Sequence, residues 1–302
     1  MTHAPNTGAP LLRERTPIVV GCTGGSGSRV VAQVLQRNGC CIGRNLNFAC
    51  DNMDFAFCLG GRLTWLQRHF PFAQDRAPAL HALDLFEKLY FSQPLGPADR
   101  LHFARIAAAY LHPRNLRLLG TRSPLQRLRS AAGLLLKSHP EPTAATSQPD
   151  IAWGFKLPGS ILLLHPLIDA YPELRFVHLV RNGKDMALSS NQKLLLHYAS
   201  LFDLPQKPDT RNSFELWSRM NRWAHDVTAE RMPTDRVLVL RFEDLCRDPG
   251  PTIDRLLAFA NLPLRDSAVY DLPRPIDSIG RWKQAPGSFN GLDTSTLELF
   301  GY

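Results

Sequence analysis

The stretch that decides the fold is PIVVGCTGGSGSRVVAQVLQRNG, residues 17–39. A β-branched run at 18–20 leads into a glycine-rich turn, and apolar residues at helical spacing follow the turn. This order predicts a buried strand, a tight loop and a helix N-terminus. Glycines let the backbone approach a ligand closely, and N–H groups at a helix N-terminus attract anions. The sequence therefore predicts an anion-binding loop formed by Gly24, Gly25, Ser26, Gly27, Ser28 and Arg29.

This loop differs from two common phosphate-binding loops. The ATP and GTP loop has the pattern GxxxxGK[ST], and no lysine is present here. The dinucleotide loop has the pattern GxGxxG, and Val30 stands where the third glycine belongs. From the loop alone, the glycines are also compatible with close helix–strand packing and no ligand.

The composition is that of an ordinary globular chain, with 302 residues, 44% hydrophobic and 21% charged. A formal net charge of +8 favours an anionic partner, but charge alone does not distinguish nucleic acid, an anionic membrane and a phosphorylated small molecule. The six cysteines have no CxxC spacing, which predicts a reducing compartment without zinc or disulfides. Residues 1–16 lack the apolar core of a signal peptide, and no run reaches membrane-spanning length. We expect a cytoplasmic protein with a loose N-terminal tail and no metal.

The order of patterns along the chain predicts one α/β domain over 17–302. Residues 62–137 have helical periodicity and many arginines, and we expect a helical insertion on the acceptor side there. Residues 138–150 are polar and proline-rich, which predicts a mobile loop. Apolar strands then alternate with helices, the latter expected at 160–170, 182–198, 212–231 and 252–259. This alternation indicates a mostly parallel sheet covered on both faces, with ligands at the carboxyl ends of its strands.

A second anion-binding element follows the apolar run LRFVHLV at 174–180. Arg181 comes directly after this strand, on the same expected rim as the glycine loop. Ser189 comes eight residues later, about two turns into the expected helix, so both side chains can converge on one anion. An arginine at this place can also be a simple ion-pair partner.

Several segments resemble the sulfotransferases that use 3′-phosphoadenosine-5′-phosphosulfate (PAPS). The segment at 174–192 resembles their 3′-phosphate segment, and 237–263 resembles their strand, Arg-Phe/Tyr-Glu-Asp turn and helix. Residues 280–283 (GRWK) resemble their late basic-aromatic element. Residues 43–57 and 153–158 are similar to segments of bacterial members. The presence of all these motifs in the family's order is a more specific sign of the resemblance than any single motif.

The resemblance implies a sulfotransferase fold related to P-loop NTPases and kinases, with no metal. It places the 5′-phosphosulfate on Gly24–Arg29 and the 3′-phosphate on Arg181 and Ser189. Arg281 and Lys283 add positive charge, and Trp282 packs near the nucleotide. A sulfuryl group then moves in line to an acceptor hydroxyl or amine, leaving adenosine 3′,5′-bisphosphate (PAP).

The loop departs from the family pattern because the usual basic residue before Ser-Gly-Ser is missing; Thr23, Gly24 and Gly25 stand there. We predict that Lys156, at the end of the next strand, replaces this cation, with Arg44 and Arg29 as the next choices. If no cation replaces it, the chain binds PAPS without efficient transfer.

The general base is predicted from sequence proximity to the loop. Asp51 is the first choice and Asp54 the second; both are expected one turn apart on a helix within 48–59. Structural roles are expected for His165, His178, Glu243 and Asp244.

Two other classes of function remain as alternatives. A P-loop kinase is disfavoured by the missing lysine, and nucleic-acid binding by aromatics that follow core patterns. The sequence does not distinguish carbohydrate, lipid, phenol or peptide acceptors, and it does not indicate the oligomeric state.

Overall fold

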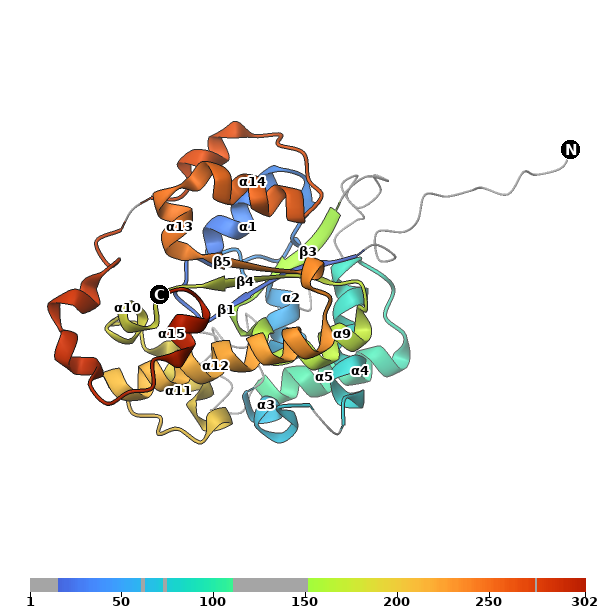
Figure 1. Cartoon of the computed structure of the whole chain (residues 1–302). Coiled ribbons are helices and arrows are strands. Elements are labelled where there is room, and N and C mark those ends of the chain that lie inside the picture. The colour runs from blue at the N-terminus through green and yellow to red at the C-terminus, as the bar shows by residue number, and fades with distance from the viewer. Residues whose placement is uncertain (1–15, 61–62, 73–74, 111–151, 275) are drawn as a thin grey trace, which may run out of the picture.

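The computed structural model describes residues 16–60, 63–72, 75–110, 152–274 and 276–302. Its centre is a five-stranded, all-parallel sheet of order β2-β3-β1-β4-β5. The strands are β1 (Ile18–Cys22), β2 (Cys40–Cys41), β3 (Ala152–Lys156), β4 (Arg175–Val180) and β5 (Val237–Arg241). Strand β1 lies in the middle, where the strand order reverses, and this is the place where parallel sheets bind ligands. The predicted α/β architecture is confirmed (Figure 1).

Helices cover both faces of the sheet. The described helices of the first half are α1 (Ser28–Arg37), α2 (Met53–Phe55), η2 (Ala56–Gly60), α3 (Leu63–His69), α4 (Ala77–Tyr90) and α5 (Pro97–Tyr110). The helices between β3 and β5 are η4 (Pro158–Leu163), α9 (Leu164–Ala170), α10 (Gly183–Ala187), α11 (Lys193–Tyr198), η5 (Ala199–Phe202), α12 (Thr210–Arg231) and η6 (Thr234–Arg236). After β5 come α13 (Phe242–Arg247), α14 (Pro249–Phe259), η7 (Ser267–Asp271), η8 (Arg281–Gln284), η9 (Pro286–Phe289) and α15 (Ser295–Leu299).

The residues of β1 explain why the strand is apolar throughout. Ile18 and Val20 pack into one hydrophobic cluster with residues of α1 and α14, whereas Val19 packs into a second cluster with residues of α4, α9 and α12. Successive side chains of a strand point to opposite faces, so a strand covered on both faces must be apolar at every position. Figure 1 shows α1, α13 and α14 on one side of the sheet and α9 and α12 on the other.

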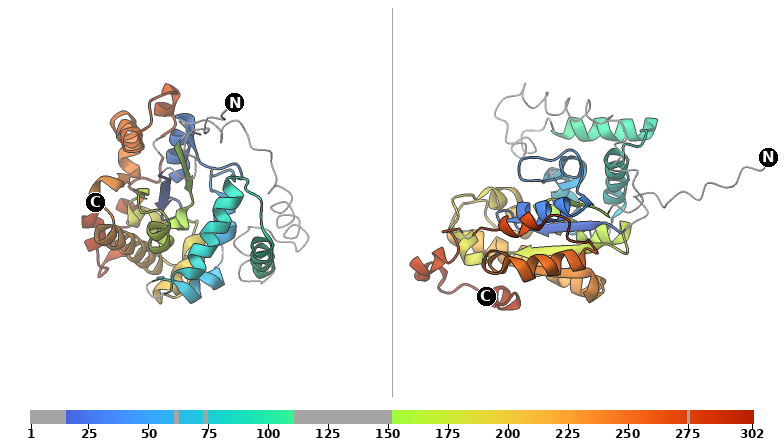
Figure 2. Two further views of the ribbon diagram at one scale, coloured as in Figure 1. Left: turned by 90° about the vertical axis from the view of Figure 1, so that its right-hand side faces the viewer. Right: turned by 90° about the horizontal axis from the view of Figure 1, so that it is seen from above.

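The region predicted as a helical insertion is helical where it is described. Helices α4 and α2 pack on β3 through aromatic rings. The ring centroid of Phe86 in α4 lies 5.2 Å from that of Phe155 in β3, and the ring of Phe55 in α2 stacks on Phe155 with centroids 4.3 Å apart. Figure 2 shows α5 at the periphery, away from α15 and the C-terminus. Residues 111–137, the predicted mobile loop at 138–150 and residues 1–15 of the predicted tail lie outside the described residues.

The single helix predicted at 182–198 is wrong, because the structure divides it into α10 and α11. Ser189 Oγ accepts the backbone N–H of Asn191 at 3.2 Å, and Gln192 Nε2 donates to the carbonyl of Ser189 at 2.5 Å. Such local side-chain bonds compete with the helix ladder. Ser189 therefore lies just after the end of α10, and α11 starts in a new direction.

The helix predicted within 48–59 begins later than expected, at Met53, so Asp51 lies in a loop. Asn47 Oδ1 accepts the backbone N–H groups of Ala49 and Asp51 at 2.8 and 2.9 Å, and Asn52 caps α2 by accepting the N–H of Phe55. Asn residues favour such turns over helix interiors. None of the helices in the described ranges is both long and apolar enough to cross a bilayer.

Candidate functional site

The glycine loop between β1 and α1 has the geometry of an anion site. Gly25 and Gly27 have φ of +88° and +82°, a region that residues with a Cβ rarely adopt. Ser26 is fully buried, and its Oγ donates to the carbonyl of Thr23 at 2.5 Å, which holds the turn. Gly27 is the N-cap of α1, and within the described chain no side chain caps this end. The first N–H groups of α1 are therefore available to an anion.

Arg181 lies next to this loop, as predicted. Its guanidinium donates to the carbonyl of Gly25 at 3.2 Å and to Ser278 Oγ at 2.6 Å, and it lies over the ring of Phe242 at 4.8 Å. Arg181 is 7% exposed, and burial lowers its pKa. Its Nε is buried and has no hydrogen-bond partner among the described residues. A buried guanidinium with a spare donor is suited to bind an anionic group.

The late basic element is held beside Arg181 by one buried carboxylate. Asp185, only 1% exposed, accepts the backbone N–H of Gly280 at 2.7 Å and that of Trp282 at 3.1 Å. Arg281 donates to the carbonyl of Leu188, at the end of α10 and next to Ser189. Lys184 Nζ, from α10, lies 4.6 Å from the ring centroid of Trp282. The structure thus brings Arg281 and Ser189 together, while the side chain of Lys283 is exposed to solvent.

We expect Asp185→Ala to lower the free energy of unfolding by about 1.5–3 kcal/mol, the range for hydrogen bonds to charged groups, because two backbone N–H groups lose a charged acceptor. If the chain binds PAP, as the resemblance implies, its affinity for PAP is expected to fall as well, since Arg281 is no longer held. Urea denaturation and calorimetric titration check both effects. Asp226→Ala is the matched control, because this carboxylate is exposed on α12. Equal behaviour of the two variants would contradict the assigned anchoring role.

The two predicted catalytic residues contact each other. Lys156 Nζ lies 2.5 Å from Asp51 Oδ1 and also donates to the carbonyl of Ala49 at 2.7 Å. Asp51 Oδ2 accepts from Asn47 Nδ2 at 2.8 Å. The side chain of Lys156 is 2% exposed, whereas that of Asp51 is 19% exposed. An ammonium has three N–H donors, so among the described residues one donor of Lys156 remains beyond these two bonds.

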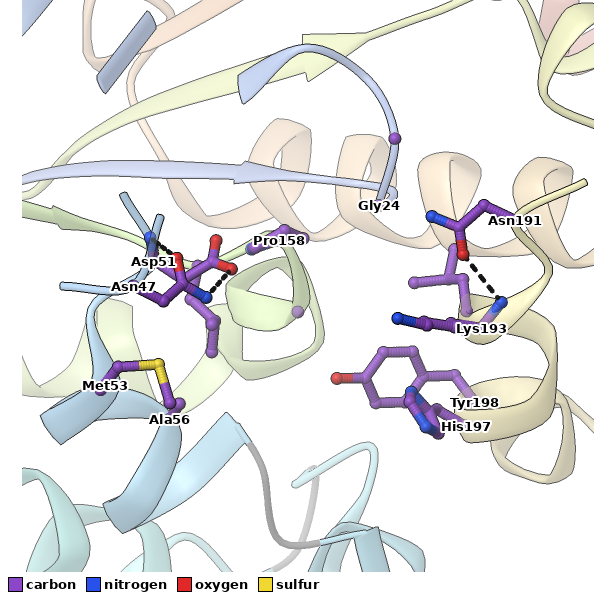
Figure 3. Close-up of a pocket in the computed structure, with 14 residues that line it drawn as sticks. Gly24, Asn47, Asp51, Met53, Ala56, Pro158, Asn191, Lys193, His197 and Tyr198 are labelled. Atoms are coloured by element: carbon purple, nitrogen blue, oxygen red, sulfur yellow. Dashed lines mark hydrogen bonds between the residues drawn. The ribbon is translucent and has the colours of Figure 1, made fainter. Parts of the chain in front are cut away.

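Two cavities meet at Asp51. The larger cavity, about 580 Å³, is lined by the glycine loop, Arg29, Lys156, Arg181 and Phe242, among others. The smaller cavity, about 280 Å³, is lined by residues of the segment 47–56, the segment 157–159, the glycine loop, Asn191 and α11. Four residues line both cavities, namely Gly25, Asp51, Pro158 and Asn191. Figure 3 shows Asp51 and Asn47 on one side of the smaller cavity and the α11 side chains facing them on the other.

The remaining candidate residues lie elsewhere. Arg44, a possible replacement cation, donates to Ser92 Oγ at 3.2 Å and lines neither cavity. Asp54 also lines neither cavity; Asn45 donates to it, and burial raises its pKa. Ser189, Arg281, Trp282 and Lys283 are likewise outside the lining of the two cavities.

The side chains that were predicted to be structural have structural partners. His178 Nε2 lies 2.9 Å from Asn221 Oδ1, and burial lowers the pKa of His178 to about 4. Glu243 accepts from the N–H of Asn182 and the hydroxyl of Tyr302. Asp244 forms an ion pair with Arg241 at 2.8 Å. On α9, His165 Nδ1 lies 3.0 Å from Nη1 of the Arg231 guanidinium.

The smaller cavity is also lined by residues that the sequence analysis did not name as site residues, among them four on α11: Lys193, Leu194, His197 and Tyr198. Their only signal in the sequence was position, shortly after the 3′-phosphate segment. Because residues 182–198 were predicted to form one continuous helix, residues 193–198 were not expected to line a cavity beside the glycine loop. Across the described ranges, no group of His, Cys, Asp and Glu side chains is arranged to hold a metal ion.

Comparisons with known proteins identify the family. The model of the sulfotransferase family matches residues 17–266. No curated protein matches the chain. Several solved structures are distantly similar, among them these three. The sulfotransferase domain from the curacin biosynthetic pathway is 14% identical, covering 87% of this chain and 80% of that chain, with a TM-score of 0.43. Sulfotransferase STF9 from Mycobacterium avium is 17% identical, with 92% and 71% covered and a TM-score of 0.40. Retinol dehydratase, solved with androsterone and the inactive cofactor PAP, is 13% identical, with 96% and 72% covered and a TM-score of 0.35. Because the family model spans most of the sequence, this chain belongs to the sulfotransferase family.

Proposed function

We propose that this chain transfers the sulfuryl group of PAPS to a hydroxyl or amine of an acceptor. The observation that carries the proposal is the larger cavity, in which the glycine loop and the buried Arg181 guanidinium line one space. PAPS carries a phosphosulfate on the 5′ position and a phosphate on the 3′ position of its ribose, so it needs two anion sites. The loop and α1 supply the first, and Arg181, with Ser278 beside it, supplies the second.

The chemistry takes place where the two cavities meet. The acceptor lies in the smaller cavity, and Asp51 takes its proton as the acceptor atom attacks the sulfur. The bond from sulfur to the bridging oxygen of the 5′-phosphate breaks, and PAP leaves. The charge that develops on this oxygen is stabilised by the loop N–H groups and by the free N–H donor of Lys156. Lys156 thereby takes the role of the missing basic residue of the loop.

A second candidate function is PAP or PAPS binding with little transfer. It is favoured by the contacts of Lys156, two of whose three donors are already bound by Asp51 and Ala49. The rate of PAP release from PAPS, measured with a panel of hydroxyl and amine acceptors, distinguishes the two functions. Release that no acceptor accelerates favours the binding protein.

The donor site is tested by thermal and chemical unfolding with PAP and with ATP. PAP at 100 times its dissociation constant is expected to add about 2.7 kcal/mol to the stability of the wild type. Arg181→Ala is expected to lose most of this gain at the same PAP concentration. Arg175→Ala is the control, because Arg175 is on the same strand but at its opposite end, where it donates to the carbonyl of Phe259.

The opposite outcomes are equally informative. A larger gain with ATP than with PAP would favour a P-loop kinase and overturn the proposal. An equal gain in Arg181→Ala and Arg175→Ala would remove Arg181 from the donor site.

A further inference from the structure

The smaller cavity has an unusual charge balance, which indicates the kind of acceptor it takes. Its titratable lining residues are Asp51, Lys193, His197 and Tyr198. The charge of Asp51 is matched by the ion pair with the buried Lys156. Burial, together with the charge of Lys193, lowers the pKa of His197 to about 4, so its imidazole is neutral at pH 7. Burial, together with the charge of Asp51, raises the pKa of Tyr198 to about 12, so this hydroxyl is neutral as well.

Lys193 is therefore the uncompensated charge of this cavity. In the part of the chain that the structure describes, its Nζ has no hydrogen bond and no ion pair. Its backbone N–H is oriented by Asn191 Oδ1 at the start of α11, and the side chain extends toward the space between α11 and Asp51 (Figure 3). Lys193 lines the cavity together with His197, which lies one turn further along α11.

We propose that Lys193 binds a negatively charged group of the acceptor, so that the enzyme acts on anionic acceptors. This inference rests on the proposed function, because it takes the smaller cavity as the acceptor site. The acceptor hydroxyl or amine lies at Asp51, and a carboxylate, phosphate or sulfate group of the same molecule lies at Lys193. Charge-assisted hydrogen bonds of this kind are stronger than neutral ones and select for the charged ligand.

The size of the cavity and the apolar part of its lining limit the body of the acceptor. Met53, Ala56, Leu157 and Leu194 are among the apolar side chains of that lining. A volume of about 280 Å³ fits one ring or a short chain in the cavity itself. The expected acceptor therefore has an apolar or ring-shaped body, with its reactive group and its anionic group at different ends.

The test uses matched pairs of small acceptors that differ in charge, with the full chain saturated with PAP. The pairs are 4-hydroxyphenylacetate and 4-(2-hydroxyethyl)phenol, glucuronate and glucose, and glycerol 3-phosphate and glycerol. Calorimetric titration is expected to show at least one pair whose anionic member binds about tenfold more tightly, as one charge-assisted hydrogen bond predicts. That preference is expected to disappear in Lys193→Gln and to persist in Lys193→Arg. Lys207→Gln is the control, since Lys207 is exposed and lines neither cavity.

The proposal is overturned if no anionic member binds, if neutral members bind equally well, or if the preference survives in Lys193→Gln. Each sample is also titrated with PAP alone. PAP affinity that is unchanged in Lys193→Gln means that a negative result concerns the acceptor only and leaves the donor site intact. If the wild type does not bind PAP, the result contradicts the proposed function itself.

Discussion

Replacement of Lys156 by methionine is expected to lower kcat by about 10²–10³-fold, the usual effect of removing one donor that stabilises developing charge. Lys156 is the cation that reaches Asp51 at the boundary between the two cavities. The bridging oxygen carries more charge in the transition state than in bound PAPS, so the affinity for PAPS and PAP is expected to fall by much less than kcat. Initial rates of PAP release and calorimetry with both nucleotides measure the two effects.

Lys156→Met also removes one partner of a buried ion pair, which typically costs about 3–5 kcal/mol of stability. The double variant Lys156→Met/Asp51→Asn separates the two consequences, because neither residue then leaves an unpaired charge. We expect it to recover most of the stability while kcat stays low. A double variant with normal kcat would show that neither side chain takes part in transfer.

The second large effect is expected for Gly27→Ala, which should lower the free energy of unfolding by about 2–5 kcal/mol. The φ of +82° is costly for alanine, and its Cβ would lie 2.3 Å from a carbon of the Phe242 ring. Since the guanidinium of Arg181 lies over that ring, a displaced Phe242 is expected to weaken PAP binding as well. Urea denaturation and PAP titration measure the two changes.

Gly250→Ala in α14 is the matched control, because a Cβ there meets nothing within 4 Å. It should be neutral or slightly stabilising. A Phe242→Leu substitution added to Gly27→Ala should recover part of the lost stability, since the smaller side chain makes room for the Cβ. If Gly27→Ala is as stable as Gly250→Ala, the loop does not have the tight geometry described here.

The fold could be predicted from local patterns because each pattern has one strong physical cause. Strands buried on both faces are apolar almost throughout, as β1 is and as β4 is apart from Arg175 and His178. The glycine loop was predictable for a similar reason, since Gly25 and Gly27 adopt positive φ. Arg181 followed from its place directly after β4, because parallel strands end on one rim.

The position of Asp51 and the course of α11 could not be predicted in the same way. Both depend on a few side-chain bonds to the backbone, from Asn47 in one case and from Ser189 and Gln192 in the other. These bonds override helical periodicity locally and redirect the chain. The contact of Lys156 with Asp51 joins residues that are 105 positions apart, so no local pattern contains it.

The two cavities share Gly25, Asp51, Pro158 and Asn191, while Lys193, His197 and Tyr198 line the smaller cavity alone. This arrangement makes the scaffold modular. The short helix α11 contributes nothing to the described lining of the larger cavity, so its side chains can change without altering that cavity. Under the proposed function, exchange of α11 between members of the family is expected to change the acceptor preference and to leave donor use unchanged.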